Sequence, residues 1–219
     1  YAKIHYVMDF QNFIASIPKI ENEMLLAEKA HVLMVPPDRK DIMQNLSIEE
    51  KNPRKAGVLM LLYPKGNKLH LVLIERNAYI GVHSSQIDLP GGKMEPQDQS
   101  IVATTLRETN EEIGIPIHKI NIIKTFSQVY IPPSNFLVFP FLGYATEELQ
   151  FVPDPKEVAA ILEVSIAELL QEATMVNKLM TTSYSTSAIV PAFKIQDYYI
   201  WGATAMILSE LKEVLKKVL

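Results

Sequence analysis

The chain has 219 residues, of which 48% are hydrophobic, and a formal net charge of −4. This length is enough for one domain with a substantial core. The acidic balance and the lack of a basic run argue against nucleic acid as a partner. Cysteine is absent, which excludes disulfides, thiol catalysis and thiolate metal sites and fits a cytoplasmic location. The longest apolar run, residues 57–63, is too short to cross a membrane.

The N-terminal part of the chain, about residues 8–54, is predicted to be an arm that precedes the main fold. Apolar residues recur at helical spacing over residues 8–17, which predicts a helix that ends before Pro18. Residues 18–54 are expected to be irregular. Residues 1–7 precede Met8, and we treat them as a candidate cloning remnant outside the fold.

The rest of the chain is predicted to mix strands with a few helices. Strands are expected at 56–63, 68–75, 120–130, 136–144, 158–164 and 189–199. Helices are expected at about 99–113, at 165–172 and at 203–219, and loops at 77–88 and 174–188. This pattern predicts one layered α/β domain over residues 8–219.

The helix expected at about 99–113 carries an unusual density of acid. Glu108, Glu111 and Glu112 are spaced i, i+3, i+4, so they share a helix face and repel one another. A cation would offset that repulsion, and hard divalent ions such as Mg²⁺ are bound by carboxylates together with water and substrate phosphates. A solvated acidic face is the alternative explanation.

The surroundings of these glutamates favour the metal hypothesis. Arg107 is placed to pair with Glu111 at i, i+4. Val102, Leu106 and Ile113 predict one buried stripe on the same helix. The helix would therefore pack one side into a core and present its carboxylates on another.

The ends of this helix are also marked in the sequence. Either Asp98 or Ser100 can cap its start, and Gly114 can close its end. Upstream, the Gly91–Gly92 turn lets a backbone approach a ligand with no Cβ in the way. The glycine turn and the acidic helix together predict a site for a charged ligand.

This stretch resembles the Nudix box, in which a glycine precedes a helix with the pattern R-E-x-x-E-E-x-G. The matching residues are Gly92, Arg107, Glu108, Glu111, Glu112, Gly114 and Ile115. Asp98 stands where the box has its first glutamate, and Thr109 stands where it has an aliphatic residue. The segment between Gly92 and Arg107 is one residue longer than in the general box, a feature of the branch of coenzyme A diphosphatases.

The similarity to that branch continues upstream of the box. The segment 72–77 and the segment 89–92 fall in the register of its motif, and Arg76 keeps the first of its two arginines. The other positions differ, with Gly81 for the second arginine, Ser85 for a glycine and Leu89 for a phenylalanine. Because a guanidinium binds phosphate strongly, the missing arginine bears most on substrate choice.

The resemblance implies a fold, a cofactor and a metal site. The fold is the Nudix α/β/α sandwich around a mixed β-sheet, and the cofactor is Mg²⁺ or Mn²⁺. Glu108 and Glu112 are the first candidates for metal ligands, Glu111 is a further one, and the carbonyl of Gly91 matches a common backbone ligand of the family.

The catalytic group is predicted to be Glu111, Arg107 and Glu157. Glu111 is a metal ligand, the base, or the partner of Arg107, and these roles stay open. Glu157 resembles a glutamate that follows the box in this branch, with a solvated loop residue as the equal alternative. A carboxylate of this kind would take the proton of a metal-bound water.

Residues around the substrate are predicted from several places in the chain. They are Arg76, Lys93, Ser134, Asn135 and Phe136, of which the last three resemble a T-P-S-G-F stretch of coenzyme A diphosphatases. A plain hairpin turn is the alternative for that stretch. Asp88 and Glu95 flank the glycine turn with surface, capping and catalytic roles all open, and Trp201 resembles a branch motif but is expected to be a core anchor.

These features predict a Mg²⁺-dependent hydrolase that cuts the diphosphate of coenzyme A or an acyl-CoA into adenosine 3′,5′-bisphosphate and 4′-phosphopantetheine. One alternative is a hydrolase of ADP-ribose or another nucleoside diphosphate sugar, and another is a non-catalytic module that binds a nucleotide. The expected partner is a small nucleotide diphosphate, with no nucleic acid and no membrane, and a homodimer stays open.

Overall fold

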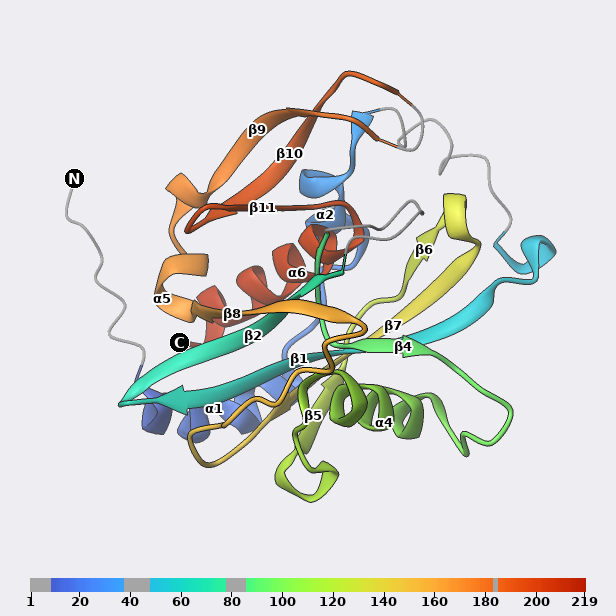
Figure 1. Cartoon of the computed structure of the whole chain (residues 1–219). Coiled ribbons are helices and arrows are strands. Elements are labelled where there is room, and N and C mark those ends of the chain that lie inside the picture. Colours follow the sequence, from blue (N-terminus) through green and yellow to red (C-terminus); the bar gives the residue numbers. More distant parts are fainter. Residues whose placement is uncertain (1–8, 38–47, 78–85, 183–184) are drawn as a thin grey trace.

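The computed structural model describes residues 9–37, 48–77, 86–182 and 185–219 (Figure 1). The candidate remnant at 1–7 lies outside the described residues, as do Gly81 and Ser85 of the upstream motif. Within the described residues, no helix is long and apolar enough to cross a membrane.

The main sheet has eight strands and mixes parallel with antiparallel pairing. β1 (Arg54–Lys65) and β2 (Lys68–Arg76) form the expected hairpin around Gly66, and β8 (Val158–Ser165) pairs with the outer edge of β2. On the other side, β7 (Phe136–Tyr144) runs parallel to β1 and pairs in turn with β5 (Asn121–Thr125) and β6 (Val129–Ile131).

The hairpin partners β1 and β2 pair only near their turn and then separate. The segment that follows β2 in the chain supplies two short strands that fill the gap between β1 and β2. β3 (Ile87–Asp88) pairs with β2, and β4 (Gly91–Lys93) pairs with β1. We call this opening, filled by residues 87–93, the fork.

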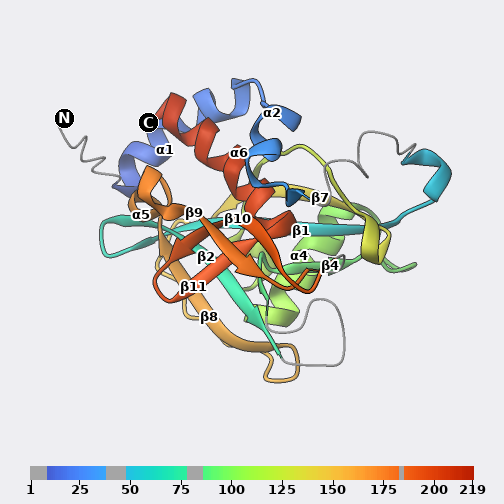
Figure 2. The same cartoon turned by 90° about the horizontal axis from the view of Figure 1, so that it is seen from above.

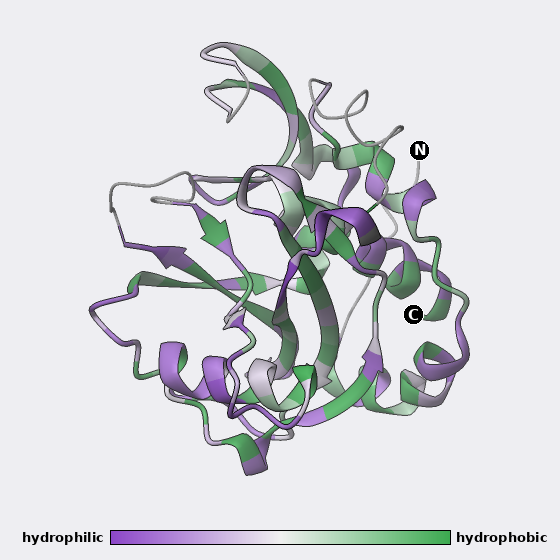
Figure 3. Ribbon diagram, turned by 90° about the vertical axis from the view of Figure 1, so that its right-hand side faces the viewer, coloured by the Kyte–Doolittle hydropathy of each residue, from purple (hydrophilic) through white to green (hydrophobic). Residues whose placement is uncertain are grey.

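Helices cover both faces of the sheet, as a sandwich requires (Figure 1). Alternate residues of β1 belong to two separate hydrophobic clusters, Leu59 and Leu61 to one and Met60 and Leu62 to the other. The first cluster packs under α4 (Ile101–Ile113), and the second packs under α1 (Phe10–Asn22) and α6 (Gly202–Val218). Hydrophobic residues concentrate in the central strands, and hydrophilic ones in the outer loops (Figure 3).

A second, three-stranded sheet lies beside α6 and above the main sheet (Figures 1 and 2). It is an antiparallel meander of β9 (Met175–Met180), β10 (Ala188–Ile195) and β11 (Tyr198–Trp201). The remaining elements are short, namely α2 (Glu28–His31), α5 (Ile166–Leu169), η1 (Val32–Met34), η2 (Glu49–Lys51), η3 (Ile117–Lys119), η4 (Pro132–Ser134) and η5 (Glu172–Thr174).

Several sequence predictions about elements are wrong, among them the irregular course expected for residues 18–54, which contain the end of α1, α2, η1 and η2. Helix α1 continues through Pro18 to Asn22, because Ile20 beyond the proline is fully buried and its packing outweighs the lost hydrogen bond. The loop expected at 174–188 contains β9, whose residues alternate too weakly in polarity to reveal a strand. The strand expected at 120–130 is interrupted at 126–128, between β5 and β6. The strand expected at 189–199 is broken by a turn at 196–197, between β10 and β11.

Candidate active site in the fork

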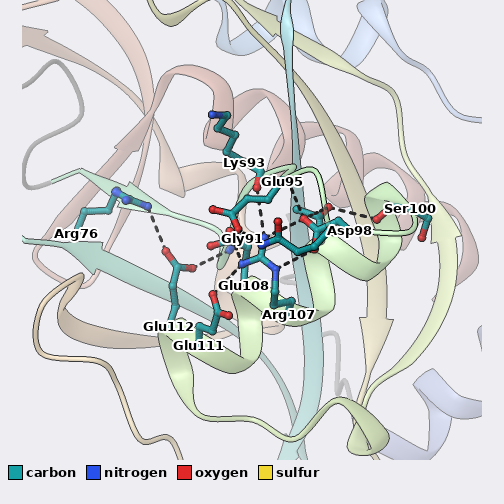
Figure 4. Close-up of polar contacts among 12 residues, drawn as sticks. Arg76, Gly91, Lys93, Glu95, Asp98, Ser100, Arg107, Glu108, Glu111 and Glu112 are labelled. Carbon is teal, nitrogen blue, oxygen red and sulfur yellow. Dashed lines mark hydrogen bonds and ion pairs between the residues drawn. The ribbon is translucent and has the colours of Figure 1, made fainter.

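The carboxyl group of Glu112 lies inside the fork and is 2% exposed. One of its oxygens accepts a hydrogen bond from the backbone N–H of Gly91 at 2.8 Å, and the other lies 3.3 Å from Nη1 of Arg76 (Figure 4). Burial raises the pKa of Glu112 to about 8, although the Gly91 N–H and the Arg76 charge act in the opposite direction. A buried carboxyl with so little compensation is poised to receive a further cation.

Glu108 lies one turn earlier on α4, against the glycine turn. A Cβ on Gly92 would collide with its carboxylate, so any larger residue there would push the Glu108 side chain out of its present position. Nη1 of Arg107 lies 2.9 Å from Oε1 of Glu108. Burial raises the pKa of Glu108, and the nearby charges of Glu111 and Glu157 add to that effect while Arg107 opposes it. Glu108 and Glu112 therefore form an acidic pair whose negative charge is only partly balanced by Arg107 and Arg76.

Arg107 organises the outer side of this pair. It donates from Nη1 to Glu111 at 2.8 Å, which confirms the i, i+4 pairing predicted from the sequence. It also donates from Nε and Nη2 to the two oxygens of Asp98, at 2.9 and 3.0 Å, a fork geometry that fixes the guanidinium plane. The Asp98 side chain is 5% exposed, and these hydrogen bonds hold the pKa of Asp98 far below its usual range.

The ends of α4 are closed as the sequence indicates. Ser100 is the N-cap and accepts a hydrogen bond from the N–H of Ala103, while Gly114 takes the left-handed conformation at the C-terminus with φ 73°. Asp98, the other candidate cap, binds Arg107 and the hydroxyl of Thr104 instead. The buried stripe consists of Thr105, Thr109 and Ile113 among others, whereas the expected Val102 and Leu106 are only partly buried.

A cavity of about 450 Å³ opens beside the fork. The predicted site residues that line it are Arg76, Gly91, Lys93, Glu108, Glu112, Ser134, Phe136 and Glu157. Glu157 is close enough to raise the pKa of both Glu108 and Glu112 by its charge. Three carboxylates from two distant parts of the chain thus meet in one cavity.

Three predicted site residues do not line the cavity. Arg107 and Glu111 are absent from the lining, and the Glu111 side chain is 57% exposed. Asn135 is also absent from the lining, because it holds its own turn in the left-handed conformation with φ 50°. Its Oδ1 accepts a hydrogen bond from Tyr130, and its Nδ2 donates to the carbonyl of Lys51.

The turn at 132–136 is braced on its outer side by Arg54. The Arg54 guanidinium stacks on the Phe136 ring at 4.1 Å and donates to the carbonyl of Ser134 at 2.7 Å. The turn presents Ser134 and Phe136 to the cavity from this fixed position. These two residues are therefore placed to touch a ligand, while Asn135 and Arg54 hold the turn.

Sequence reasoning assigned no substrate role to several residues of the lining. Asp88 and Gln86 come from β3 and the residue before it, while Trp201 is the last residue of β11 and Thr204 lies in the first turn of α6. Asp88 accepts a hydrogen bond from the Thr204 hydroxyl at 2.8 Å, across 116 positions of sequence. The resemblance of residues 198–202 to a branch motif pointed to Trp201. No feature of the neighbouring sequence, however, indicates that Trp201 lies close to the fork.

The donor chemistry of this cavity fits a hard divalent cation. Glu108, Glu112 and Glu157 offer only oxygen, and the raised pKa values of the first two show negative charge that the protein itself leaves uncompensated. Within the described part of the chain, no three acidic or histidine side chains are already gathered around one point. Instead, Glu112 contacts Arg76 and the Gly91 N–H, and Glu108 contacts Arg107. A bound cation would have to replace some of these contacts.

Comparison with known proteins decides the family. The family model of the NUDIX domain matches residues 53–183, which include the fork, α4 and Glu157. The chain belongs to the Nudix family. Nudix hydrolases act on pyrophosphate bonds and generally use divalent metal cations, and this chain is an enzyme of that kind.

Individual Nudix relatives agree with this assignment. The Nudix hydrolase NudL of Photorhabdus laumondii is 32% identical over 181 residues, which is 83% of this chain and 91% of the relative. The mitochondrial coenzyme A diphosphatase NUDT8 of Mus musculus is 30% identical over 157 residues, which is 71% of this chain and 75% of the relative. This chain is thus similar to proteins of the branch that the sequence motifs indicate.

Solved structures confirm the Nudix fold. A Nudix hydrolase of M. smegmatis, RenU, superposes with a TM-score of 0.53 at 19% identity over 76% of this chain and 88% of its own. A MutT/nudix family protein of Enterococcus faecalis superposes with a TM-score of 0.52 at 17% identity over 93% of this chain and 74% of its own. The predicted α/β/α sandwich around a mixed sheet is therefore confirmed.

Proposed function

We propose that this Nudix hydrolase cleaves the diphosphate of coenzyme A or an acyl-CoA, giving adenosine 3′,5′-bisphosphate and 4′-phosphopantetheine. The observation that carries the proposal is the meeting of Glu108, Glu112 and Glu157 in one cavity that Arg76 also lines. Arg76 is the arginine that the upstream motif shares with coenzyme A diphosphatases. The similarity to NUDT8 supports the same substrate.

Glu108 and Glu112, together with the carbonyl oxygen of Gly91, are the groups that would hold Mg²⁺ or Mn²⁺. The bound ion supplies charge neutralisation at the phosphate oxygens and lowers the pKa of a bound water. Arg107 keeps Glu108 in place from behind, since it lies 2.9 Å from Glu108 and is itself fixed by Asp98. Glu111 supports Arg107 from the solvent side.

Glu157 is the carboxylate best placed to accept the proton of the attacking water, because it lines the cavity without an ion-pair partner in the described residues. The water oxygen adds to one phosphorus, and the bond from that phosphorus to the bridging oxygen breaks. Arg76 and Lys93 are the cations of the described lining, and they bind the phosphate oxygens during this exchange.

ADP-ribose or another nucleoside diphosphate sugar is the second candidate substrate. It is favoured by one departure from the branch motif, Gly81 in place of the second arginine. Coenzyme A carries a third phosphate that needs a cation or donor partner, whereas ADP-ribose does not. A non-catalytic nucleotide-binding module is the third candidate, and the complete R-E-x-x-E-E cluster at 107–112 argues against it.

A panel of coenzyme A, 3′-dephospho-coenzyme A and ADP-ribose, assayed with Mg²⁺ or Mn²⁺, tests the proposal. We expect kcat/KM for coenzyme A to exceed that for 3′-dephospho-coenzyme A by about tenfold, or roughly 1.4 kcal/mol in transition-state binding. Arg76→Ala should shrink this ratio, whereas Glu147→Gln, on the surface beside Lys119, should leave it unchanged.

Equal kcat/KM for the first two compounds, or a clear preference for ADP-ribose, would overturn the coenzyme A assignment and keep the enzyme class. Binding of every compound with no turnover of any would instead favour the non-catalytic module. The panel therefore separates all three candidates.

A further inference from the structure

The cavity has a second region with a chemistry opposite to that of the fork. Its lining there is apolar and consists of Ile131, Phe136, Val138, Trp201, Ala203 and Ile207. We call this region the apolar arm. Its residues come from β6 and β7 of the main sheet and from the junction of β11 with α6.

Sheet register sets the separation between the fork and the apolar arm. Lys93 on β4 pairs with Ala56 on β1, and Ala56 pairs with Val138 on β7. Neighbouring strands lie about 4.8 Å apart, so Val138 is two spacings, roughly 10 Å, from the glycine strand. Ile131 on β6 pairs with Phe136 and lies one spacing further. A ligand whose diphosphate occupies the fork therefore places a different part of itself in the arm.

The charges of the cavity are divided in the same way. Among the described lining residues, the cations are Arg76 and Lys93, and both belong to the fork region. Among the charged residues of the described lining, Asp88 of the fork is tied to the first turn of α6, because the Thr204 hydroxyl donates a hydrogen bond to it at 2.8 Å. The Arg54 guanidinium, outside the lining, stacks on the Phe136 ring. Asp88 already provides a negative charge beside the N-terminus of α6, and it would repel a phosphate there.

Two polar groups beside the arm remain able to bind an uncharged ligand. Asp88 lines the cavity and can accept a hydrogen bond from a hydroxyl or amide N–H. Ser134 also lines the cavity, and its buried Oγ has no hydrogen-bond partner within the described residues. Solvent does not reach this Oγ in its present position, so a ligand gains its hydrogen bond after rotation about the Ser134 Cα–Cβ bond.

We propose that the apolar arm binds the uncharged half of an asymmetric diphosphate substrate, an aliphatic chain that carries hydroxyl or amide groups. Asp88 accepts a hydrogen bond from one of these groups, Ser134 pairs with another, and Phe136 and Trp201 cover the aliphatic part. The inference rests on the proposed diphosphatase function and fixes which end of the substrate lies in the arm. The half that carries additional phosphate lies on the side of Arg76 and Lys93.

Trp201 makes the arm directly observable, because it is the only tryptophan of the chain. We expect pantetheine, which has no phosphate, to change the emission of Trp201 in a saturable way. Adenosine 3′,5′-bisphosphate should bind with little change in that emission. The reverse result, in which the bisphosphate alters Trp201 and pantetheine does not, would place the nucleotide half in the arm and overturn the inference.

A substitution that fills the arm provides the second test. Ala203→Phe adds a ring to the lining, so we expect KM for coenzyme A to rise by about tenfold with a smaller change in kcat. The inhibition constant of pantetheine should rise with it, while that of adenosine 3′,5′-bisphosphate stays the same. Ala167→Phe on α5, outside the cavity lining, is the matched control and should change none of these values.

Equal weakening of both inhibitors by Ala203→Phe would contradict the inference. Asp88→Asn is a second variant of nearly unchanged shape, which guards against misfolding of the first, and it should weaken pantetheine selectively. The fluorescence and inhibition constants do not need turnover. Absence of diphosphate hydrolysis would therefore refute the proposed function, whereas loss of the pantetheine effects alone would refute the assignment of the arm.

Discussion

Two glutamates of this protein are equally buried and behave in opposite ways. Glu112 on α4 is 2% exposed, and burial raises its pKa. Glu210 on α6 is fully buried, and burial alone would raise its pKa too, but the His31 ring 3.6 Å away and hydrogen bonds from Ser127 and Ala27 outweigh that effect and the pKa is lowered. The difference lies in the number of donors that the fold gives to each carboxylate.

Glu210 is a structural group whose needs are met within the protein. It accepts hydrogen bonds from the N–H of Ala27 at 2.6 Å, the N–H of Ser127 at 3.0 Å and the hydroxyl of Ser127 at 2.7 Å. It thereby joins the N-terminal arm to the segment between β5 and β6. Glu112 has one backbone N–H and a longer contact to Arg76. A buried carboxylate to which the fold gives few hydrogen-bond donors is therefore a better candidate for a functional group than one with a full set of donors.

Neutralising Glu112 should give the largest effect. We expect Glu112→Gln to lower kcat by on the order of 10²-fold or more, because it removes a charged ligand of the cation that positions the substrate. In metal-free buffer above about pH 8, where the Glu112 carboxyl is ionised, the variant should unfold at the same or a higher temperature than the wild type, since a poorly compensated buried charge is gone. Near wild-type turnover at saturating Mg²⁺ would remove α4 from consideration as the metal site.

The same change at Glu210 should have the reverse profile. Glu210→Gln places an amide where three donors converge, so we expect the free energy of unfolding to fall by about 2–3 kcal/mol. Turnover per folded molecule should stay near that of the wild type. Denaturant titration and an assay on the same preparations measure both quantities. A stable but inactive variant would show that the contrast between the two glutamates is misjudged.

Arg107 connects the acidic pair to its support. We expect Arg107→Ala to lower both stability and metal affinity, because it leaves Glu108 and Asp98 without their cation. Glu111→Gln is the matched control, since it breaks only an exposed i, i+4 pair worth about 0.3–0.5 kcal/mol. Melting curves and metal titration by calorimetry compare the two. If both variants behave alike, Arg107 is only a surface partner of Glu111.

The smallest effect concerns the pH dependence of the contact between Asp98 and Arg107. The pKa of Asp98 is depressed from its ordinary value of 3.8, so its stabilising contribution is fully present above that value and is lost as the pH falls through the lower folded pKa. Asp98→Asn should therefore be less stable than the wild type at neutral pH. The difference in the free energy of unfolding between the two proteins should become smaller below about pH 4. Denaturant titrations over this range measure the difference, and a difference that is constant with pH would mean that Asp98 acts through packing.

The parts of the site that could be predicted are those encoded within a few residues. The cap at Ser100, the end at Gly114 and the pairing of Arg107 with Glu111 all follow from helix periodicity and end signals. Phe136 and Glu157 were identified only by resemblance, because each reaches the cavity from a strand or turn far from α4 in the sequence.

The contacts that sequence reasoning missed depend on how distant elements pack. The bidentate contact of Asp98 with Arg107 requires the loop before α4 to fold back, and the contact of Asp88 with Thr204 requires α6 to begin beside the fork. Trp201 was expected to be a core anchor, and the structure places it in the cavity lining. Helix α1 was predicted too short because Pro18 is a local signal, whereas the burial of Ile20 is a tertiary one.

The strands of the main sheet differ in the number of residue pairs that join them, and the fork has few such pairs. β1 and β7 are joined over most of their length, whereas β4 is joined to β1 at three residue pairs and β3 to β2 at two. The N–H of Gly91 is bound to Glu112. The backbone that borders the acids is therefore paired over a shorter length than β1 and β7, and its amide protons should exchange with solvent before those of β1 and β7. A change in the charge of Glu112 alters the strength of its hydrogen bond with the Gly91 N–H. The segment 87–93 can therefore adjust to a ligand while β1 and β7 keep their register.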